Sequence, residues 1–272
     1  MSRPHIPAEL LDYVVDHLYD ARDALKSCCL VSKSWIPCAR KHLFASVGFY
    51  DATGLQSWKN TFPDPSTSPA CYTHHLVVCC SEAVTFADAE ERSLIAAFSR
   101  VVHLQMFVNA KTPSLIPFHG FSPALKYLSV TYRCFPFSRI LSLIRSFPLI
   151  EHLTLIAFYY DPSIYGDDGF DGQQTIIQPS FSGGTLGLCI NGGMDLIIPH
   201  LLPLQDRLRF RTLVLTLNNE EDILSISLLV ERCCLTLESL MVYVGCYSTP
   251  LSHLYPYQLP ILIYRRAGAT FD

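Results

Sequence analysis

The stretch Leu125-Lys126-Tyr127-Leu128-Ser129-Val130 has apolar residues at its first, fourth and sixth positions. Apolar and polar residues alternate over its second half, which is typical of a strand with one buried face, because successive strand residues point to opposite sides. The same spacing begins at six points along the chain: Phe44, Val101, Leu125, Ile150, Phe210 and Leu237. Two weaker copies begin at Thr73 and Thr185 and are centred on Leu76 and Leu188. The sequence therefore contains a degenerate repeat.

The units that contain this pattern have similar lengths, with central apolar residues 24 to 35 residues apart. Between the strand patterns, residues 89–98, 138–147 and 221–233 carry apolar residues at helical spacing. A strand and a helix in each unit of this length resemble leucine-rich repeats, whose asparagine after the pattern occurs here as Asn109 and Asn218. The resemblance implies an α/β fold in which stacked units form an irregular solenoid with a curved parallel sheet.

The repeat pattern also predicts which side chains are internal. The central leucines are expected to stack as one ladder inside the protein: Leu104, Leu128, Leu153, Leu213 and Leu240. Their neighbours, such as Gln105 and Ser129, should point outward. Residues 159–184 are rich in Gly, Pro and Asp and predict a loop. Residues 259–264 predict a last strand, at an edge or with Pro260 near its start, because proline cannot donate to a sheet ladder.

Residues 6–44, ahead of most of the repeats, predict three short helices. Apolar residues from Ile6 to Leu18 recur at the spacing of one helical face. Pro7 suits the first turn of this helix, since its missing N–H costs nothing there. Asp23 is expected to cap the second helix and Ser34 the third, with Pro37 in the third helix's first turn.

This segment resembles the F-box. The matching residues are Ile6-Pro7-x-Glu9-Leu10-Leu11-x-x-Val14-Val15-x-x-Leu18, Asp23-x-Leu25 and Leu30-Val31-Ser32-x-x-Trp35. The version from Cys29 to Trp35, followed by residues 40–44, is most similar to F-box proteins of mushroom-forming fungi. The resemblance implies an F-box domain over residues 1–45 and a leucine-rich-repeat-like, substrate-binding domain over residues 46–272.

The two resemblances together imply a function in protein–protein interaction. They suggest a substrate adaptor: the substrate-recognition subunit of an SCF-type (cullin-RING) E3 ubiquitin ligase complex, with no enzyme activity of its own. The F-box would dock on a Skp-family adaptor and, through it, on a cullin, while the repeats bind an unknown target protein. The residues implied for adaptor contact are Pro7, Leu10, Leu11, Val14, Leu18, Leu25, Val31 and Trp35. The alternatives are a scaffold acting outside a ubiquitin ligase and a repeat protein with a decayed F-box.

Composition limits the other partners. The chain has 272 residues, 50% hydrophobic and 16% charged, with a net charge of −4. Because phosphate binding needs a basic patch, nucleic acid is not an expected partner. Apolar runs stay well short of the ~20 residues that span a bilayer, so no membrane contact is expected. The eleven cysteines include no C-x-x-C spacing, and no signal-peptide core is present, which favours reduced thiols and a cytoplasmic or nuclear location.

No motif predicts catalysis, a cofactor or a metal. Residues 167–178 have Gly169 and Gln178 where a calcium loop needs oxygen ligands and a bidentate glutamate. The run from Cys71 to Cys80 contains cysteines and histidines, but on a strand they would point to opposite faces and could not surround one zinc ion. Residues 183–187 lack the lysine of a phosphate-binding loop, and no nucleophile or zinc-protease motif occurs.

Overall fold

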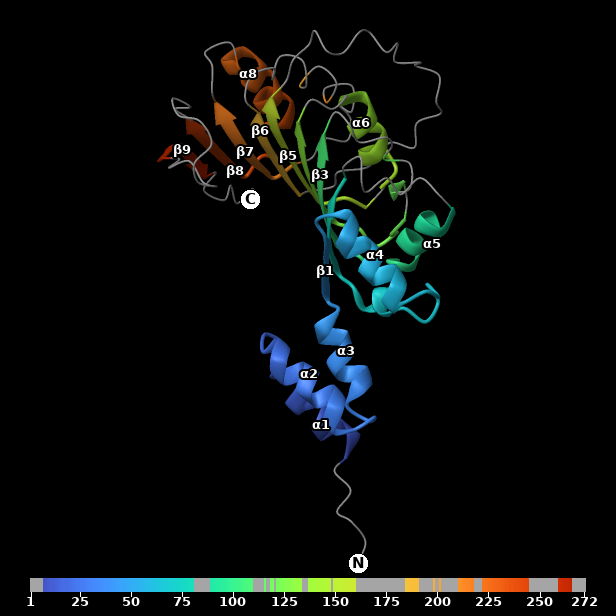
Figure 1. Ribbon diagram of the computed structural model, residues 1–272. Helices are drawn as coiled ribbons and strands as arrows, with labels where there is room; N and C mark the ends of the chain where they lie inside the picture. The colour runs from blue at the N-terminus through green and yellow to red at the C-terminus, as the bar shows by residue number, and fades with distance from the viewer. Residues whose placement is uncertain are drawn as a thin grey trace, which may run out of the picture.

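The computed structural model describes most of the repeat units and all three predicted N-terminal helices (Figure 1). The described residues are 7–80, 89–109, 115, 118, 119, 121–133, 137–147, 149–159, 184–190, 198, 201, 210–217, 222–244 and 259–265. The predicted loop at residues 159–184 therefore lies almost entirely outside them. Among the described helices, none combines the length and the apolar character that a membrane crossing requires.

The elements alternate between helix and strand over much of the chain. In order they are α1 (Ala8–Asp16), α2 (Arg22–Val31), α3 (Ile36–Leu43), β1 (Ser46–Phe49), α4 (Ala52–Thr61), η1 (Pro69–Tyr72), β2 (His75–Cys79), α5 (Ala89–Ala97), β3 (His103–Asn109), β4 (Tyr127–Arg133), α6 (Phe137–Arg145), β5 (His152–Tyr159), β6 (Thr185–Ile190), β7 (Thr212–Leu217), α8 (Asp222–Cys233), β8 (Ser239–Val244) and β9 (Leu259–Arg265).

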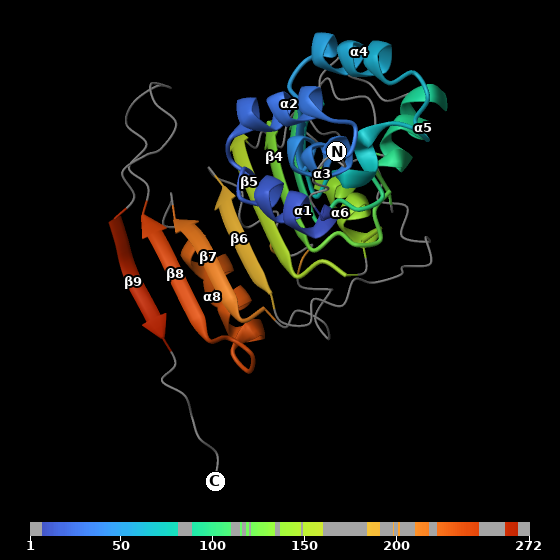
Figure 2. The same ribbon diagram turned by 90° about the horizontal axis from the view of Figure 1, so that it is seen from below.

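The strands form one sheet in which spatial order follows chain order from β1 to β9. Strands β1 to β8 are parallel, each to the next, which confirms the predicted α/β class and parallel sheet. The predicted last strand is present as β9, with Pro260 as its second residue, but it pairs with β8 in the antiparallel direction. Helices α4, α5, α6 and α8 lie on one side of the sheet (Figure 2).

The sheet register confirms the predicted internal ladder. One row of paired residues runs across the parallel strands: Val47, Leu76, Leu104, Leu128, Leu153, Leu186, Leu213 and Leu240. All eight side chains are buried in one core cluster, together with side chains of α4, α5, α6 and α8. We call this row the leucine ladder.

The centre of one weak copy of the repeat was predicted wrongly. The sequence pattern centres the sixth unit on Leu188, whereas the structure places Leu186 in the ladder and pairs Leu188 with Leu155 and Leu215. Leu186 and Leu188 are two residues apart, point to the same side of the strand and are both buried, so the sequence pattern alone permits either one as the centre. Pairing of Thr185 with His152 on one side and with Thr212 on the other decides between them.

The three N-terminal helices pack around a small core of their own. We call these helices and their connections the helical unit (residues 7–45). Val15, Leu25, Cys28 and Ala39 are buried there in a cluster distinct from that of the sheet. The predicted caps are wrong: Ala21 and Trp35, not Asp23 and Ser34, precede α2 and α3. The Ser34 hydroxyl instead lies 2.9 Å from the Ser32 hydroxyl, and the N–H of Ser34 donates to the hydroxyl oxygen of Ser32.

An aromatic cluster covers the β1 end of the sheet. Helix α4, which the sequence pattern did not predict, begins after Asp51, whose Oδ1 accepts from the N–H of Gly54 at 2.7 Å. Its Trp58 lies edge-on to Phe44 and Phe49 at 5.8 and 5.7 Å between ring centres. Phe44 directly follows α3. The chain therefore passes from the helical unit into the sheet core within a few residues.

Candidate functional site

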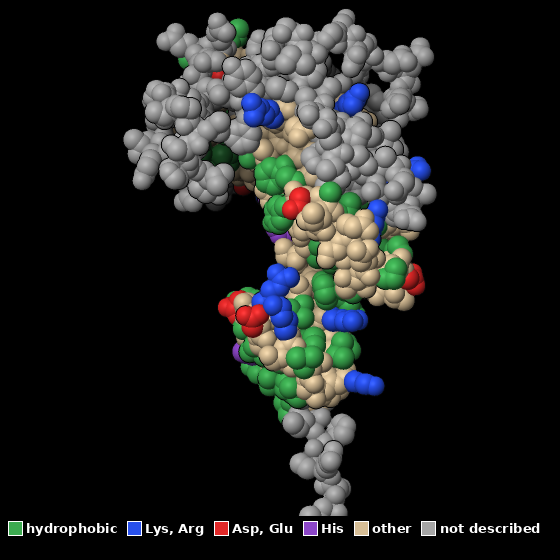
Figure 3. Space-filling view, in the orientation of Figure 1, with side chains coloured by type: hydrophobic (Ala, Val, Ile, Leu, Met, Phe, Trp, Pro, Cys, Tyr) green, Lys and Arg blue, Asp and Glu red, His purple; other side chains and the backbone are tan. Residues whose placement is uncertain are grey.

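The helical unit exposes many large apolar side chains. Half of the twelve exposed large hydrophobic residues described in the protein belong to it: Leu10, Tyr13, Val14, Tyr19, Leu30 and Val31. We call these six the apolar surface. Figure 3 shows hydrophobic side chains over much of the lower part of this unit. Concentrations of exposed apolar side chains of this kind typically mark sites of protein or ligand contact.

Helix geometry explains why these side chains are exposed. In α1, Val15 points into the small core, while Leu10 and Val14, one turn apart, share the outer side. In α2, Leu25 and Cys28 are buried, while Leu30 and Val31 at the end of the helix are exposed. A unit of three short helices leaves apolar side chains exposed more readily than a large domain does, because the fraction of surface buried on folding falls with size.

Seven of the eight predicted adaptor-contact residues fall into three groups. Pro7, Leu10, Val14 and Val31 are exposed, with exposed fractions of 56% for Leu10 and 70% for Val31. Leu18 and Trp35 are partly buried and pack against the small core. The side chain of Leu11 lies outside the described part of the structure.

Leu25, the eighth predicted contact residue, is buried. Its side chain is 1% exposed and belongs to the small core, so it supports the helices from within instead of offering a contact surface. Conversely, three members of the apolar surface were not predicted: Tyr13, Tyr19 and Leu30. The position of Tyr13 three residues after Leu10 could have identified it, since residues at this spacing are neighbours on a helix.

The sheet carries a second candidate surface on the side opposite the leucine ladder. On each parallel strand, the residue directly before the ladder position points to this side. These residues all carry a hydroxyl group or an imidazole ring. They are Ser46, His75, His103, Tyr127, His152, Thr185, Thr212 and Ser239. Each is at least partly exposed. We call them the polar row, and sequence analysis did not predict it.

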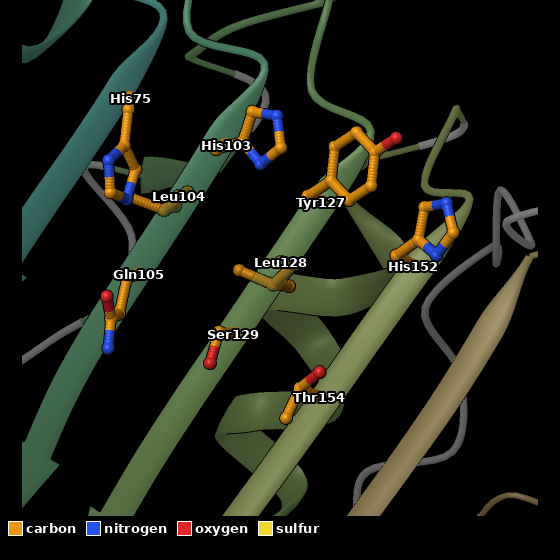
Figure 4. A pocket seen from close by; sticks show the side chains of 9 residues that line it. All are labelled: His75, His103, Leu104, Gln105, Tyr127, Leu128, Ser129, His152 and Thr154. Carbon is orange, nitrogen blue, oxygen red and sulfur yellow. The ribbon is translucent and has the colours of Figure 1, made fainter. Parts of the chain in front are cut away.

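Stacked rings occupy the middle of the polar row (Figure 4). The rings of His103 and Tyr127 are 4.0 Å apart and nearly parallel, at 5°. Tyr127 and His152 repeat this arrangement at 4.3 Å and 3°. His75 meets His103 edge-on at 6.0 Å. Because adjacent strands are about 4.8 Å apart, four rings on four neighbouring strands form one continuous row.

The rings border a shallow depression of about 200 Å³, whose floor and sides include Gln105, Ser129 and Thr154. Burial lowers the pKa of His103, and the nearby His75 and His152 lower it further. His103 is therefore neutral near pH 7, when one ring nitrogen donates and the other accepts a hydrogen bond. The depression offers hydroxyl, amide and imidazole groups to a polar ligand.

Two ion pairs flank the polar row at the start of the strands. Lys126 and Glu151 are 2.7 Å apart, and Arg211 and Glu238 are 3.4 Å apart. The hydrogen bond with Glu151 raises the pKa of Lys126, and the same bond lowers the pKa of Glu151. Each pair joins two neighbouring units. Because each pair contains one positive and one negative side chain, the two pairs add no net charge to this edge of the described surface.

No family model, no curated protein and no solved structure matches this chain.

Proposed function

We propose that this protein is the substrate-recognition subunit of an SCF-type ubiquitin ligase. In this proposal the helical unit is an F-box that docks on a Skp-family adaptor, and the adaptor links it to a cullin. The strands and helices that follow are a leucine-rich-repeat-type solenoid that holds a target protein. The observation that carries the proposal is the apolar surface, which lies on the segment whose sequence resembles the F-box.

The energetics of docking favour this use of the apolar surface. Removing a large apolar side chain from water contributes about 1.5–3 kcal/mol when its burial is complete. Leu10 and Val14 are about half exposed, and Leu30 is almost completely exposed at 88%. A partner that covers these residues and the tyrosines beside them would gain several such contributions, which is enough for a stable interface with a few dominant residues.

The arrangement of the sheet supports the solenoid part of the proposal. Each strand pairs with its neighbours in the sequence, and one helix-bearing side packs on the leucine ladder. Units stacked in this way leave the opposite side of the sheet free for recognition. The target would contact the polar row there, so the protein would act by holding the target near the ubiquitin-transferring enzyme and raising its effective concentration.

A double substitution on α1 tests adaptor docking. Replacing Leu10 and Val14 with lysine puts two charges where the interface would exclude water, which costs several kcal/mol. Since every 1.4 kcal/mol is a factor of ten, we expect the affinity for a fungal Skp-family adaptor to fall about 100-fold or more. Lysine is chosen because α1 is already acidic, with Glu9, Asp12 and Asp16. The measurement is co-purification with the adaptor, followed by titration of the two purified proteins.

The matched control is the pair Leu224→Lys and Leu228→Lys. These residues are also one turn apart and exposed, but they lie on α8, far along the chain from the helical unit. We expect this variant to bind the adaptor as the wild type does. Adaptor binding that survives the α1 substitutions would reject the proposed surface. Binding of the adaptor without recruitment of a cullin would favour a scaffold outside a ubiquitin ligase.

A further inference from the structure

A group of metal-ligating side chains lies between α1 and α3. Asp16, the last residue of α1, faces Cys38 and His42 of α3. One carboxylate oxygen, the thiol sulfur and one imidazole nitrogen of these residues all lie within 4.8 Å of one another. The Nε2 of His42 is 2.6 Å from Oδ1 of Asp16, and the Sγ of Cys38 is 3.8 Å from the same oxygen.

Helical spacing assembles this group. Cys38 and His42 are four residues apart, so they project from one side of α3 on consecutive turns. Asp12 and Asp16 have the same separation on α1, and the main-chain oxygen of Asp12 is 3.9 Å from the Sγ of Cys38. Two pairs with matching spacing therefore face each other, with Asp12 beside Cys38 and Asp16 beside His42.

The bonds within the group do not by themselves explain its composition. A hydrogen bond between His42 and Asp16 is enough to tie α3 to α1. It gives no reason for the thiol of Cys38 beside two acidic residues. Burial first, and then Asp12 and Asp16, raise the pKa of this thiol to about 11. Lys41 is the nearby positive side chain, and it lowers the pKa of Asp16 less than His42 does.

We propose that Asp16, Cys38 and His42 bind one Zn²⁺ ion, with Asp12 or a water molecule in the fourth position. Zinc is favoured over calcium or magnesium because a thiolate and an imidazole are ligands that the latter two avoid. Tetrahedral zinc needs bonds of about 2.0–2.3 Å, which the side chains reach when the His42–Asp16 hydrogen bond opens around the ion. Ion binding would release the Cys38 proton to solvent and leave His42 neutral, bound through Nε2.

The site is open enough for an ion to enter. The side chains of Asp16 and His42 are 50% and 17% exposed. A bound ion would join α1 to α3, and α1 is the helix that also carries Leu10 and Val14. It would therefore fix the orientation of that part of the apolar surface. Binding of the ion is a property of the isolated chain, so it is tested independently of any adaptor.

Cobalt and zinc titrations of the full-length, reduced protein test the site. A tetrahedral Co²⁺ ion with a thiolate ligand gives visible absorption bands and a charge-transfer band in the near ultraviolet. We expect both bands to saturate at one ion per chain and to disappear when Zn²⁺ is added. The variants Cys38→Ser and His42→Gln should each weaken zinc binding by about 10-fold or more in competition with a chelating dye.

Two exposed residues provide matched controls, since the chain has many other cysteines and histidines. Cys71→Ser and His74→Gln change exposed side chains near β2, and both should bind zinc as the wild type does. A wild-type measurement covers the case in which Cys38→Ser fails to fold. Zinc should slow alkylation of Cys38, followed by mass spectrometry, and leave the rate at Cys71 unchanged. Absence of this protection, or equal zinc affinity in the wild type and both site variants, would overturn the proposal.

Discussion

Replacing Leu128 with alanine is expected to lower the free energy of unfolding by about 2–5 kcal/mol. Leu128 is 2% exposed and is paired in the leucine ladder between Leu104 and Leu153. Its truncation leaves a cavity that neighbours on both sides cannot fill, because their own positions are set by the same sheet register. Urea denaturation of the full-length protein, followed by circular dichroism, measures the loss.

Ser129→Ala is the matched control for this substitution. Ser129 is the next residue of β4, points to the opposite side of the sheet and is partly exposed. Its substitution should change the free energy of unfolding by no more than about 0.5 kcal/mol. Similar losses in the two variants would show that the inner and outer sides of β4 have been assigned wrongly.

Gly184→Ala is expected to cost about 3 kcal/mol or more, because overpacking against fixed backbone forces neighbouring strands apart. A Cβ atom on Gly184 would overlap the carbonyl oxygen of Glu151. That oxygen accepts the N–H of Thr185 at 3.0 Å, and the oxygen of Gly184 accepts the N–H of Arg211 at 2.9 Å. The clash therefore falls where three neighbouring strands begin.

Gly187→Ala provides a comparison within the same strand. The atoms nearest to its Cβ atom would be those of the Thr154 side chain, at 3.3 Å or more, and a side chain can adjust by a few tenths of an ångström. We expect a change of less than about 1 kcal/mol. Melting temperatures of the two variants make the test, and a Gly184→Ala protein as stable as the wild type would show that β5 and β6 are spaced differently.

The parallel sheet could be predicted from the sequence because each strand follows a short local rule. The apolar spacing at Leu104, Leu128 and Leu153 appears unchanged in the observed register. Helices α5 and α6 were also predicted, since their apolar residues recur at helical spacing. The rule failed at Leu188 because apolar residues at both 186 and 188 satisfy the alternation.

Other features depend on contacts that no local pattern contains. Residues 52–61 include glycine, threonine and asparagine, all weak helix formers, and α4 forms because Leu55 and Trp58 pack on the sheet core. Likewise, helical spacing places Leu25 on an apolar side of α2. It does not show whether that side meets α3 or an external partner.

Both the polar row and the Asp16–Cys38–His42 group are products of tertiary pairing. His103 and His152 are separated by 49 positions in the printed sequence, and only the register of β3, β4 and β5 brings both against Tyr127. Asp16 and His42 are 26 residues apart and meet because α1 packs on α3. A search for metal ligands close together in the sequence favours the run from Cys71 to Cys80 and overlooks this group.

The order of the strands has a consequence for how the chain acquires its structure. Every parallel pairing joins strands that follow one another in the sequence, at separations of 24 to 33 residues along the leucine ladder. Closing such short segments costs little chain entropy, and that cost rises slowly with length. Folding can therefore nucleate in any adjacent pair of units and propagate outward in both directions, as in a one-dimensional Ising chain.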